Sequence, residues 1–183
     1  MRTVGLDLSL TATGIAVIEH RPSGLSVDLH SVGSKGHKGD TLKGRHARLD
    51  DLRDRIMRHV DGADLVVIEG PSFGAQRQGG THDRAGLWWM VMDALHLWDT
   101  GAAAVAEVPP ATLKKYLTGK GNAGKDEVLL AVARRYADID VRTNDQADAL
   151  GLAAMGARHL GHPIDDLPKL NLSAMDAVRW EET

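Results

Sequence analysis

The sequence contains no cysteine among its 183 residues, and only 4% of the residues are aromatic, with a single Phe. The absence of cysteine excludes disulfides, thiolate metal sites and cysteine nucleophiles, which leaves oxygen and imidazole groups as ligands for any metal ion. The formal net charge of -3 is small, so binding to nucleic acid would have to rest on local clusters of charge. No apolar run reaches the length of a signal sequence or a membrane span. We therefore expect a cytoplasmic protein with no membrane partner.

The rest of the composition is typical of a compact domain that buries its own core. Hydrophobic residues make up 43% of the chain and charged residues 26%, which fits one globular unit of this length. We expect a single folded domain over residues 1–160. A mostly polar C-terminal tail with scattered Leu and Met, residues 161–183, is expected to pack loosely against it.

Hydrophobic patterning predicts an α/β fold. Three β-rich segments, 3–8, 13–19 and 25–32, follow one another with short polar connections and predict an antiparallel meander. The continuous apolar run 64–69 is typical of a central parallel strand buried on both faces. Apolar residues spaced by three, four or seven predict an amphipathic helix over 41–60. The remaining expected elements are helices over 82–98, after residue 110, over 125–136 and over 144–159, and a strand over 103–108.

Four carboxylates stand at positions that invite a functional explanation. Asp7 lies inside the first strand, where Asp is disfavoured, and Glu69 closes the most apolar strand at the edge of the sheet where ligands bind in open α/β sheets. Asp145 and Asp148 are three residues apart and so lie on one face of the last helix. Each position alone has an adequate structural explanation, since strand ends are solvated, Asn144 can cap the helix, and acids favour its first turn.

Taken together, the four carboxylates indicate a metal site. If the first strand lies beside the strand 64–69, Asp7 and Glu69 are neighbours, and the last helix can bring Asp145 and Asp148 to them. Carboxylates in such a cluster repel one another and would retain protons unless a cation neutralised them. Mg²⁺ or Mn²⁺ bound by carboxylates, water and substrate phosphate suits phosphoryl chemistry, in which two ions about 3.5–4 Å apart flank the scissile phosphate.

Four segments of the sequence resemble RuvC-type Holliday junction resolvases. They occur in the order found in that family, and the ordered set is more specific than any one motif. The segments are DLSLTATG at 7–14, VVIEGP at 66–71, PPATLKKYLTGKGNAGKDEV at 109–128 and NDQADALGLA at 144–153.

The resemblance implies an RNase H-like fold with a mixed five-stranded sheet flanked by helices. It also implies a homodimer that nicks four-way DNA junctions in pairs, depends on Mg²⁺ or Mn²⁺, and leaves 5′-phosphate and 3′-hydroxyl ends. In this sequence it assigns metal binding to the four carboxylates and phosphate contact to Lys125 and to one of Lys114 or Lys115. An RNase H-like nuclease acting on flaps, forks or other branched DNA is the alternative function.

Two loops depart from the family pattern. Leu8 and Ser9 replace the usual Pro-Gly of the first loop, and Phe73 lies one residue later than the aromatic that the family sets against the junction. Phe73 can act either as a base-stacking wedge or as a loop anchor in the core. The departures put substrate preference in doubt more than metal binding, and they suggest a divergent branch such as a phage one.

Two basic segments are expected to contact DNA. Between Pro109 and Lys125 there are four Lys and no acid, with three Gly that allow close approach to a backbone. Between Gly33 and Leu49 five cations accompany only one acid. Alone, such runs are usually solvated faces, but the carboxylate cluster favours DNA contact. The expected contacts are Lys114, Lys115, Lys120, Lys125, Phe73, Lys43 and Arg45.

Rival functions match the sequence less well. The segment GKGNAGKD at 119–126 approaches a nucleotide-binding P-loop, but it has Asp126 where Ser or Thr should bind magnesium, and the residues before it predict a helix rather than a strand. No nucleotide cofactor is therefore expected. An actin-like ATPase would need two duplicated domains, and a catalytically silent module of the same fold would not need all four acids. Adjacent Trp88 and Trp89 in one helix are consistent with a dimer contact as well as with core packing.

Overall fold

The computed structural model describes residues 1–71, 80–97 and 104–180. Its centre is a five-stranded mixed sheet with the strand order β3-β2-β1-β4-β5. The first three strands form the predicted antiparallel meander, and β4 and β5 run parallel to β1. The predicted mixed sheet is confirmed. The strands are β1 (Arg2–Asp7), β2 (Thr13–Arg21), β3 (Gly24–Val32), β4 (Leu65–Glu69) and β5 (Ala104–Val108).

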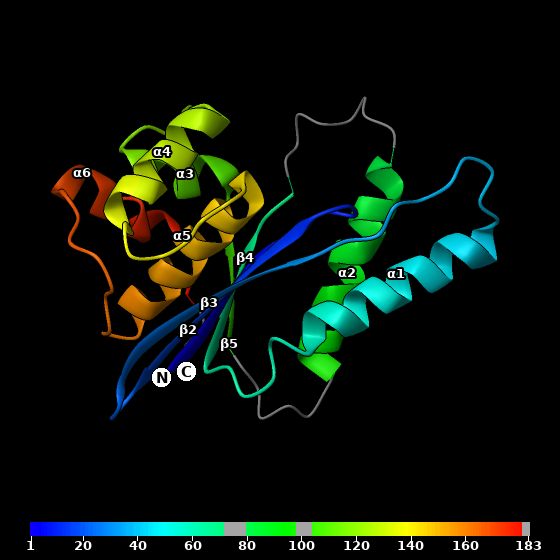
Figure 1. Ribbon diagram of the computed structural model, residues 1–183, viewed down its shortest axis with the longest axis horizontal. Coiled ribbons are helices and arrows are strands. Elements are labelled where there is room, and N and C mark those ends of the chain that lie inside the picture. The colour runs from blue at the N-terminus through cyan, green and yellow to red at the C-terminus, as the bar shows by residue number, and fades with distance from the viewer. Residues whose placement is uncertain (72–79, 98–103, 181–183) are drawn as a thin grey trace.

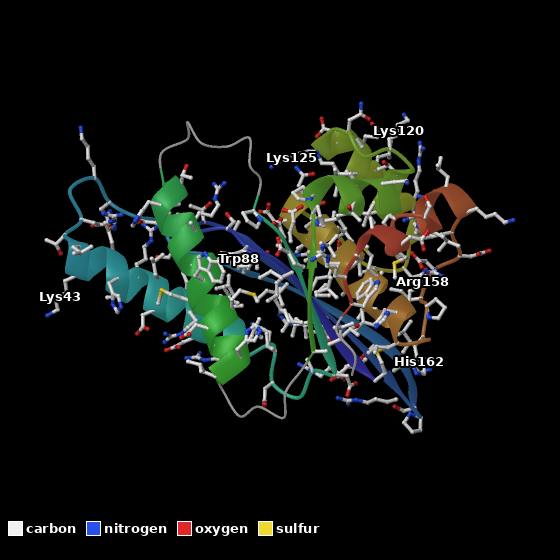
Figure 2. The ribbon with its side chains drawn as sticks, turned by 180° about the vertical axis from the view of Figure 1, so that it is seen from behind. Lys43, Trp88, Lys120, Lys125, Arg158 and His162 are labelled. Atoms are coloured by element: carbon white, nitrogen blue, oxygen red, sulfur yellow. The ribbon has the colours of Figure 1, made fainter. Side chains whose placement is uncertain are left out.

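Helices cover both faces of this sheet (Figure 1). On one face lie α1 (Leu42–Met57) and α2 (Thr81–Leu97), which pack against each other. On the other face α5 (Asn144–His159) lies along β1 and β2. Outside α5 are α3 (Pro110–Thr118), α4 (Lys125–Arg135), the short α6 (Lys169–Leu172) and a 3₁₀ turn at Met175–Ala177. The opposite view separates side chains of the two faces, with Lys43 and Trp88 on the α1–α2 side and Lys120, Lys125, Arg158 and His162 on the α5 side (Figure 2).

Glycines allow α5 to lie unusually close to the sheet. A Cβ atom on Gly5 would stand 2.1 Å from the carbonyl oxygen of Ala149, and one on Gly14 would stand 1.9 Å from that of Asp145. Neither position leaves room for any side chain, because backbone blocks both. The first turn of α5 is thereby held directly over the ends of β1 and β2, which pair Asp7 with Gly14.

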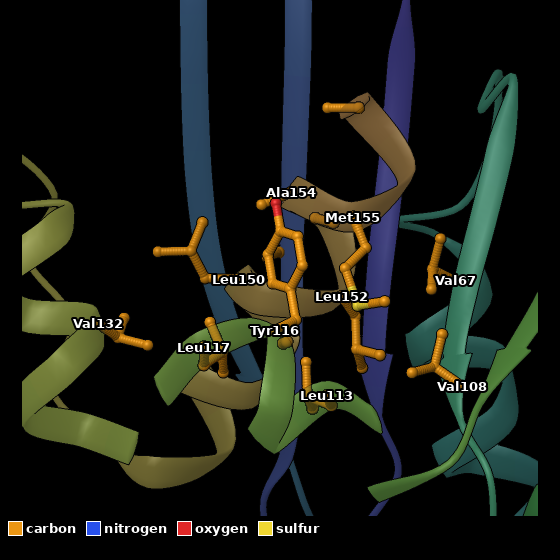
Figure 3. Packing of buried hydrophobic residues seen from close by; sticks show 14 of the residues in the cluster. Val67, Val108, Leu113, Tyr116, Leu117, Val132, Leu150, Leu152, Ala154 and Met155 are labelled. Carbon is orange, nitrogen blue, oxygen red and sulfur yellow. The ribbon is translucent and has the colours of Figure 1, made fainter. Parts of the chain in front are cut away.

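The core on the α5 side is built from that helix and from α3. Tyr116, Leu113 and Leu117 of α3 are buried against Leu150 of α5 (Figure 3). A Cβ atom on Gly151 would come within 2.9 Å of Leu113, so α3 also lies close to α5. These contacts fix the position of the α3–α4 unit, which carries the lysines of the first basic segment.

The C-terminal residues are packed rather than loose. Leu167, Ala174 and Val178 belong to the core on the α5 side, and the buried Asn171 donates a 2.8 Å hydrogen bond from Nδ2 to the carbonyl oxygen of Tyr116. The expectation of a loosely packed tail is therefore wrong. A mostly polar segment can still bury its few apolar residues when its polar groups form hydrogen bonds or ion pairs with the rest of the protein.

Asp165 provides such partners. Its side chain is only 1% exposed and forms an ion pair with Arg158 of α5, with 2.6 Å between Nη2 and Oδ1. It also accepts hydrogen bonds from the hydroxyls of Tyr116, at 3.2 Å, and Tyr136, at 2.5 Å. One buried carboxylate thus joins the tail to α3, α5 and the end of α4.

None of the described helices is both long enough and apolar enough to cross a membrane.

Candidate functional site

Asp7 and Glu69 meet at the ends of two neighbouring parallel strands. In the β1–β4 register Leu6 lies opposite Ile68, so the two acids follow at the same level. Their carboxyl groups share a hydrogen bond. The expectation that the first strand lies beside β4 and brings these acids together is met by the sheet order.

The N-terminal end of α5 supplies the other two acids, Asp145 in its first turn and Asp148 in its second. Thr143 is the N-cap, with its hydroxyl accepting a 3.2 Å hydrogen bond from the Gln146 backbone N–H. The Gln146 side chain in turn accepts a 3.0 Å bond from the Arg142 backbone N–H. The assignment of Thr143 as the N-cap corrects the interpretation of Asn144 as the cap. The cap holds Asp145 and Asp148 at the end of α5 that lies against Gly14.

Electrostatic coupling shows that the four carboxylates occupy one site. The pKa of Asp7 is raised to about 9, first by burial and then by charge repulsion from Glu69, Asp148 and Asp145. The pKa of Glu69 is raised to about 7, first by burial and then by Asp148. Burial raises the pKa of Asp148 to about 6, with an additional contribution from Asp145. Without a cation, the cluster retains protons near neutral pH.

Two lysines face the same cluster. Lys125, the first residue of α4, and Lys114 of α3 both act to lower the pKa of Glu69 and of Asp148. The principal cationic contributions to the pKa values of both carboxylates come from Lys114 and Lys125 rather than from Lys115. Of the two lysines between which the sequence left phosphate contact open, Lys114 is the one that acts electrostatically on the acids.

The donor set fits a hard divalent cation. All four acidic side chains offer oxygen atoms, which Mg²⁺ and Mn²⁺ prefer. Burial and then charge repulsion raise the pKa values of Asp7, Glu69 and Asp148, and a cation would relieve that repulsion. Across residues 1–71, 80–97 and 104–180, no three Asp, Glu or His side chains are close enough together to coordinate a metal ion without rearrangement. Metal binding would have to replace the hydrogen bond between Asp7 and Glu69 and draw the carboxylates together.

The other residues expected to contact DNA lie outside this cluster. Lys120 forms an ion pair with Glu127, with 2.9 Å between Nζ and Oε1. Arg45 of α1 makes a two-pronged ion pair with Asp83 of α2. Lys43 lies at the outer end of α1, far from Lys125 in Figure 2. Phe73 lies outside the described residues.

One contact to the site was missed in the sequence. The indole N–H of Trp88 donates a 3.2 Å hydrogen bond to the carbonyl oxygen of Glu69. Trp88 also packs edge-on against Trp89, with ring centroids 4.9 Å apart. The sequence suggested core packing or a dimer contact for this pair, and no local signal indicated that one indole anchors the end of β4.

Comparisons with known proteins add sequence relatives and a fold. No protein-family model matches the chain. The chain is 49% identical over 53 residues to the crossover junction endodeoxyribonuclease RuvC of Synechococcus sp. strain CC9311, but this match covers only 28% of the chain and 33% of the relative. It is 26% identical over 157 residues to the RuvC of Rickettsia prowazekii, which covers 84% of the chain and 94% of the relative.

Solved structures of RuvC proteins resemble this chain over most of its length, as the longer sequence match does. The structure of Thermus thermophilus RuvC superposes with a TM-score of 0.65 at 22% identity, over 91% of this chain and all (100%) of that one. T. thermophilus RuvC in complex with a Holliday junction substrate gives a TM-score of 0.64 at 20% identity, over 91% and 99%. The RNase H-like fold expected from the sequence is confirmed.

Proposed function

We propose that this chain, which is RuvC-like in sequence and in fold, is a metal-dependent endonuclease that resolves Holliday junctions by paired phosphodiester hydrolysis. The observation that carries the proposal is the meeting of Asp7 and Glu69 with Asp148 and Asp145 beside two lysines. The match along most of the Rickettsia RuvC supports the same function, whereas the stronger Synechococcus match spans only a third of the relative.

The four carboxylates would hold the metal ions in this proposal. Two Mg²⁺ or Mn²⁺ ions, when bound, supply an activated water and stabilise the leaving oxygen. Asp7 and Glu69 must first lose the proton that they share, which the approach of cations favours. Lys125 and Lys114 would contact the scissile phosphate and offset its charge. The products would carry 5′-phosphate and 3′-hydroxyl ends.

The remaining proposed DNA contacts differ in whether the side chain must first break an ion pair with another residue. Lys115 is adjacent to Lys114 on α3 and has no ion pair among the described residues. Lys120 and Arg45 would have to leave Glu127 and Asp83 before they could bind phosphate. Lys43 is exposed and free of such a pair within the described part of the chain. Phe73 would stack on a base, on the strength of its sequence position alone.

A homodimer would form through α2. Trp89 is 67% exposed and Leu97 is 72% exposed. Together with Met90, Met92, Asp93 and His96, Trp89 lines a surface hollow of about 510 Å³. An exposed apolar surface of this kind is typical of a protein interface. A dimer suits the proposed activity, because paired nicking of a four-way junction needs two active sites.

Cleavage of a panel of labelled DNA substrates tests the proposed function. Four-way junction, flap, fork and linear duplex would each be incubated with Mg²⁺ or Mn²⁺. We expect paired nicks in the junction, little cleavage of the linear duplex, and loss of all cleavage in Asp7→Asn with junction binding retained. Asp61→Asn, an equal change at an exposed position away from the cluster, should cleave normally.

Three outcomes would contradict parts of the proposal. Preferential cleavage of flaps or forks would favour the alternative branched-DNA nuclease. Equal cleavage of the linear duplex would exclude a resolvase. Cleavage retained by Asp7→Asn would show that Asp7 is not a metal ligand.

A further inference from the structure

Asn144, the first residue of α5, has an unsatisfied buried oxygen. Its side-chain Oδ1 is buried and accepts no hydrogen bond within the described residues. The other buried side-chain polar atoms without a partner in that part of the chain are nitrogens of Arg2, Arg48 and Arg135. Asn144 therefore carries the unpaired buried acceptor, and such an acceptor costs free energy unless a donor, a water or an ion meets it.

Helix capping does not explain this side chain. Thr143 caps the first turn of α5, because its hydroxyl accepts a hydrogen bond from the Gln146 backbone N–H. The usual structural role of Asn at the start of a helix is thus already filled by the residue before it. The side chain of Asn144 is left without a structural task in the capping of α5.

The position of Asn144 links it to the carboxylate cluster. It precedes Asp145 directly and lies one helical turn before Asp148, so Asn144 and Asp148 share a face of α5. That face includes Gly151, which lies against α3, the helix that carries Lys114. The unpaired oxygen thus lies at the same end of α5 as the two acids that complete the proposed metal site.

We propose that Asn144 supplies a further oxygen ligand, directly or through a bound water, to the divalent cation held by Asp145 and Asp148. Amide oxygens bind hard cations, and a neutral ligand adds no charge to a cluster in which carboxylates already repel one another. A cation or its water would also satisfy the buried acceptor. This inference rests on the proposed metal-dependent function.

Metal binding without DNA tests the inference. The affinities of wild type, Asn144→Ala and Asn144→Asp for Mg²⁺ and Mn²⁺ would be measured by calorimetry, with the metal-dependent rise in Tm as a second readout. We expect Asn144→Ala to weaken metal binding about 10-fold. Its metal-free Tm should equal or exceed that of wild type, because the substitution removes an unsatisfied acceptor. Asn144→Asp keeps an oxygen and should bind metal at least as tightly as wild type.

Asn122→Ala is the matched control. Asn122 is exposed in the turn between α3 and α4, and its loss should leave metal affinity unchanged. Wild-type metal affinity in Asn144→Ala would overturn the inference and leave the proposed function intact. A lower affinity in Asn144→Asp would also overturn it, and this variant decides the matter if Asn144→Ala does not fold. Failure of the wild type itself to bind either ion would overturn both proposals.

Discussion

The two faces of the sheet are built for different tasks. On the α5 face, Gly5 and Gly14 bring helix and sheet backbones into direct contact, and the polar groups of the site are held by short, specific interactions. On the α1–α2 face, large apolar groups such as Trp89 remain exposed. The α5 face therefore holds the groups of the proposed site in fixed positions, whereas the α1–α2 face has an exposed apolar surface suited to binding a partner protein.

Charge behaves differently on the two faces as well. Burial of the carboxylates on the α5 face raises their pKa values and makes their protonation sensitive to every neighbouring charge. On the other face Arg45 is paired with Asp83 near the surface, where such a pair contributes little to stability and can be exchanged for another anion. Substitutions on the α5 face should therefore change chemistry, and those on the α1–α2 face should change association.

The largest effect should separate two lysines on the α5 side, Lys125 of α4 and Lys115 of α3. Lys125→Ala removes a cation that acts on Glu69 and Asp148, and we expect junction cleavage to slow by on the order of 100-fold. Lys115→Ala also removes one positive charge, but this charge is not one of those that act on Glu69 and Asp148. We therefore expect it to slow cleavage far less. Single-turnover cleavage of bound junction measures both. Equal rates in the two variants would show that general attraction to DNA, rather than position, explains the role of Lys125.

Much of this face follows from the sequence, and the exceptions have physical reasons. Asp7 and Glu69 could be paired in advance because strand order fixes where parallel strands end. The choice between Lys114 and Lys115 depends on the rotation of α3 against α5, which long-range packing sets. The sequence pattern did not distinguish Thr143 from Asn144 as the cap, since both residue types can cap a helix.

The tail and the solvent-facing cations were harder to predict. Burial of the tail depends on Asp165, whose partners Tyr116, Tyr136 and Arg158 lie 7 to 49 residues away along the chain. The pairing of Lys120 with Glu127 likewise arises only once the turn before α4 has formed. Local charge patterns count cations correctly but do not show which of them are already paired.

A smaller effect should appear on the α1–α2 face. Trp89→Glu places a charge on the exposed apolar surface of α2, and the dimer dissociation constant should rise by at least about 10-fold. Leu42→Glu makes a similar change at a residue of α1 that is 78% exposed, and should leave the dimer intact. Analytical ultracentrifugation over a concentration series measures both.

The outcome bears on the contrast between the faces. A Trp89→Glu protein that remains dimeric would place the interface elsewhere. If it becomes monomeric, we expect its metal affinity to change little, because Trp89 belongs to α2, on the face opposite to α5, and reaches the site only through Trp88.

The smallest effect concerns the stability of the α5 face itself. The folded-state pKa of Asp7 is about 9 against an ordinary value of 3.8, so between these pH values the folded protein binds more protons than the unfolded chain. Stability of the metal-free protein must then fall as pH rises through this window. We expect Tm in EDTA to decrease by on the order of 5 °C from pH 5 to pH 8.5.

Two controls connect this slope to the carboxylate cluster. Asp7→Asn should make it shallower, because the amide does not titrate while Glu69 and Asp148 still do. Asp61→Asn at an exposed position should leave it unchanged. Saturating Mg²⁺ or Mn²⁺ should also reduce or reverse the slope, since cations bind the deprotonated carboxylates of the folded state. A slope as steep in Asp7→Asn as in wild type would assign the pH dependence to groups other than Asp7. The raised pKa of Asp7 would then no longer distinguish the α5 face from the α1–α2 face.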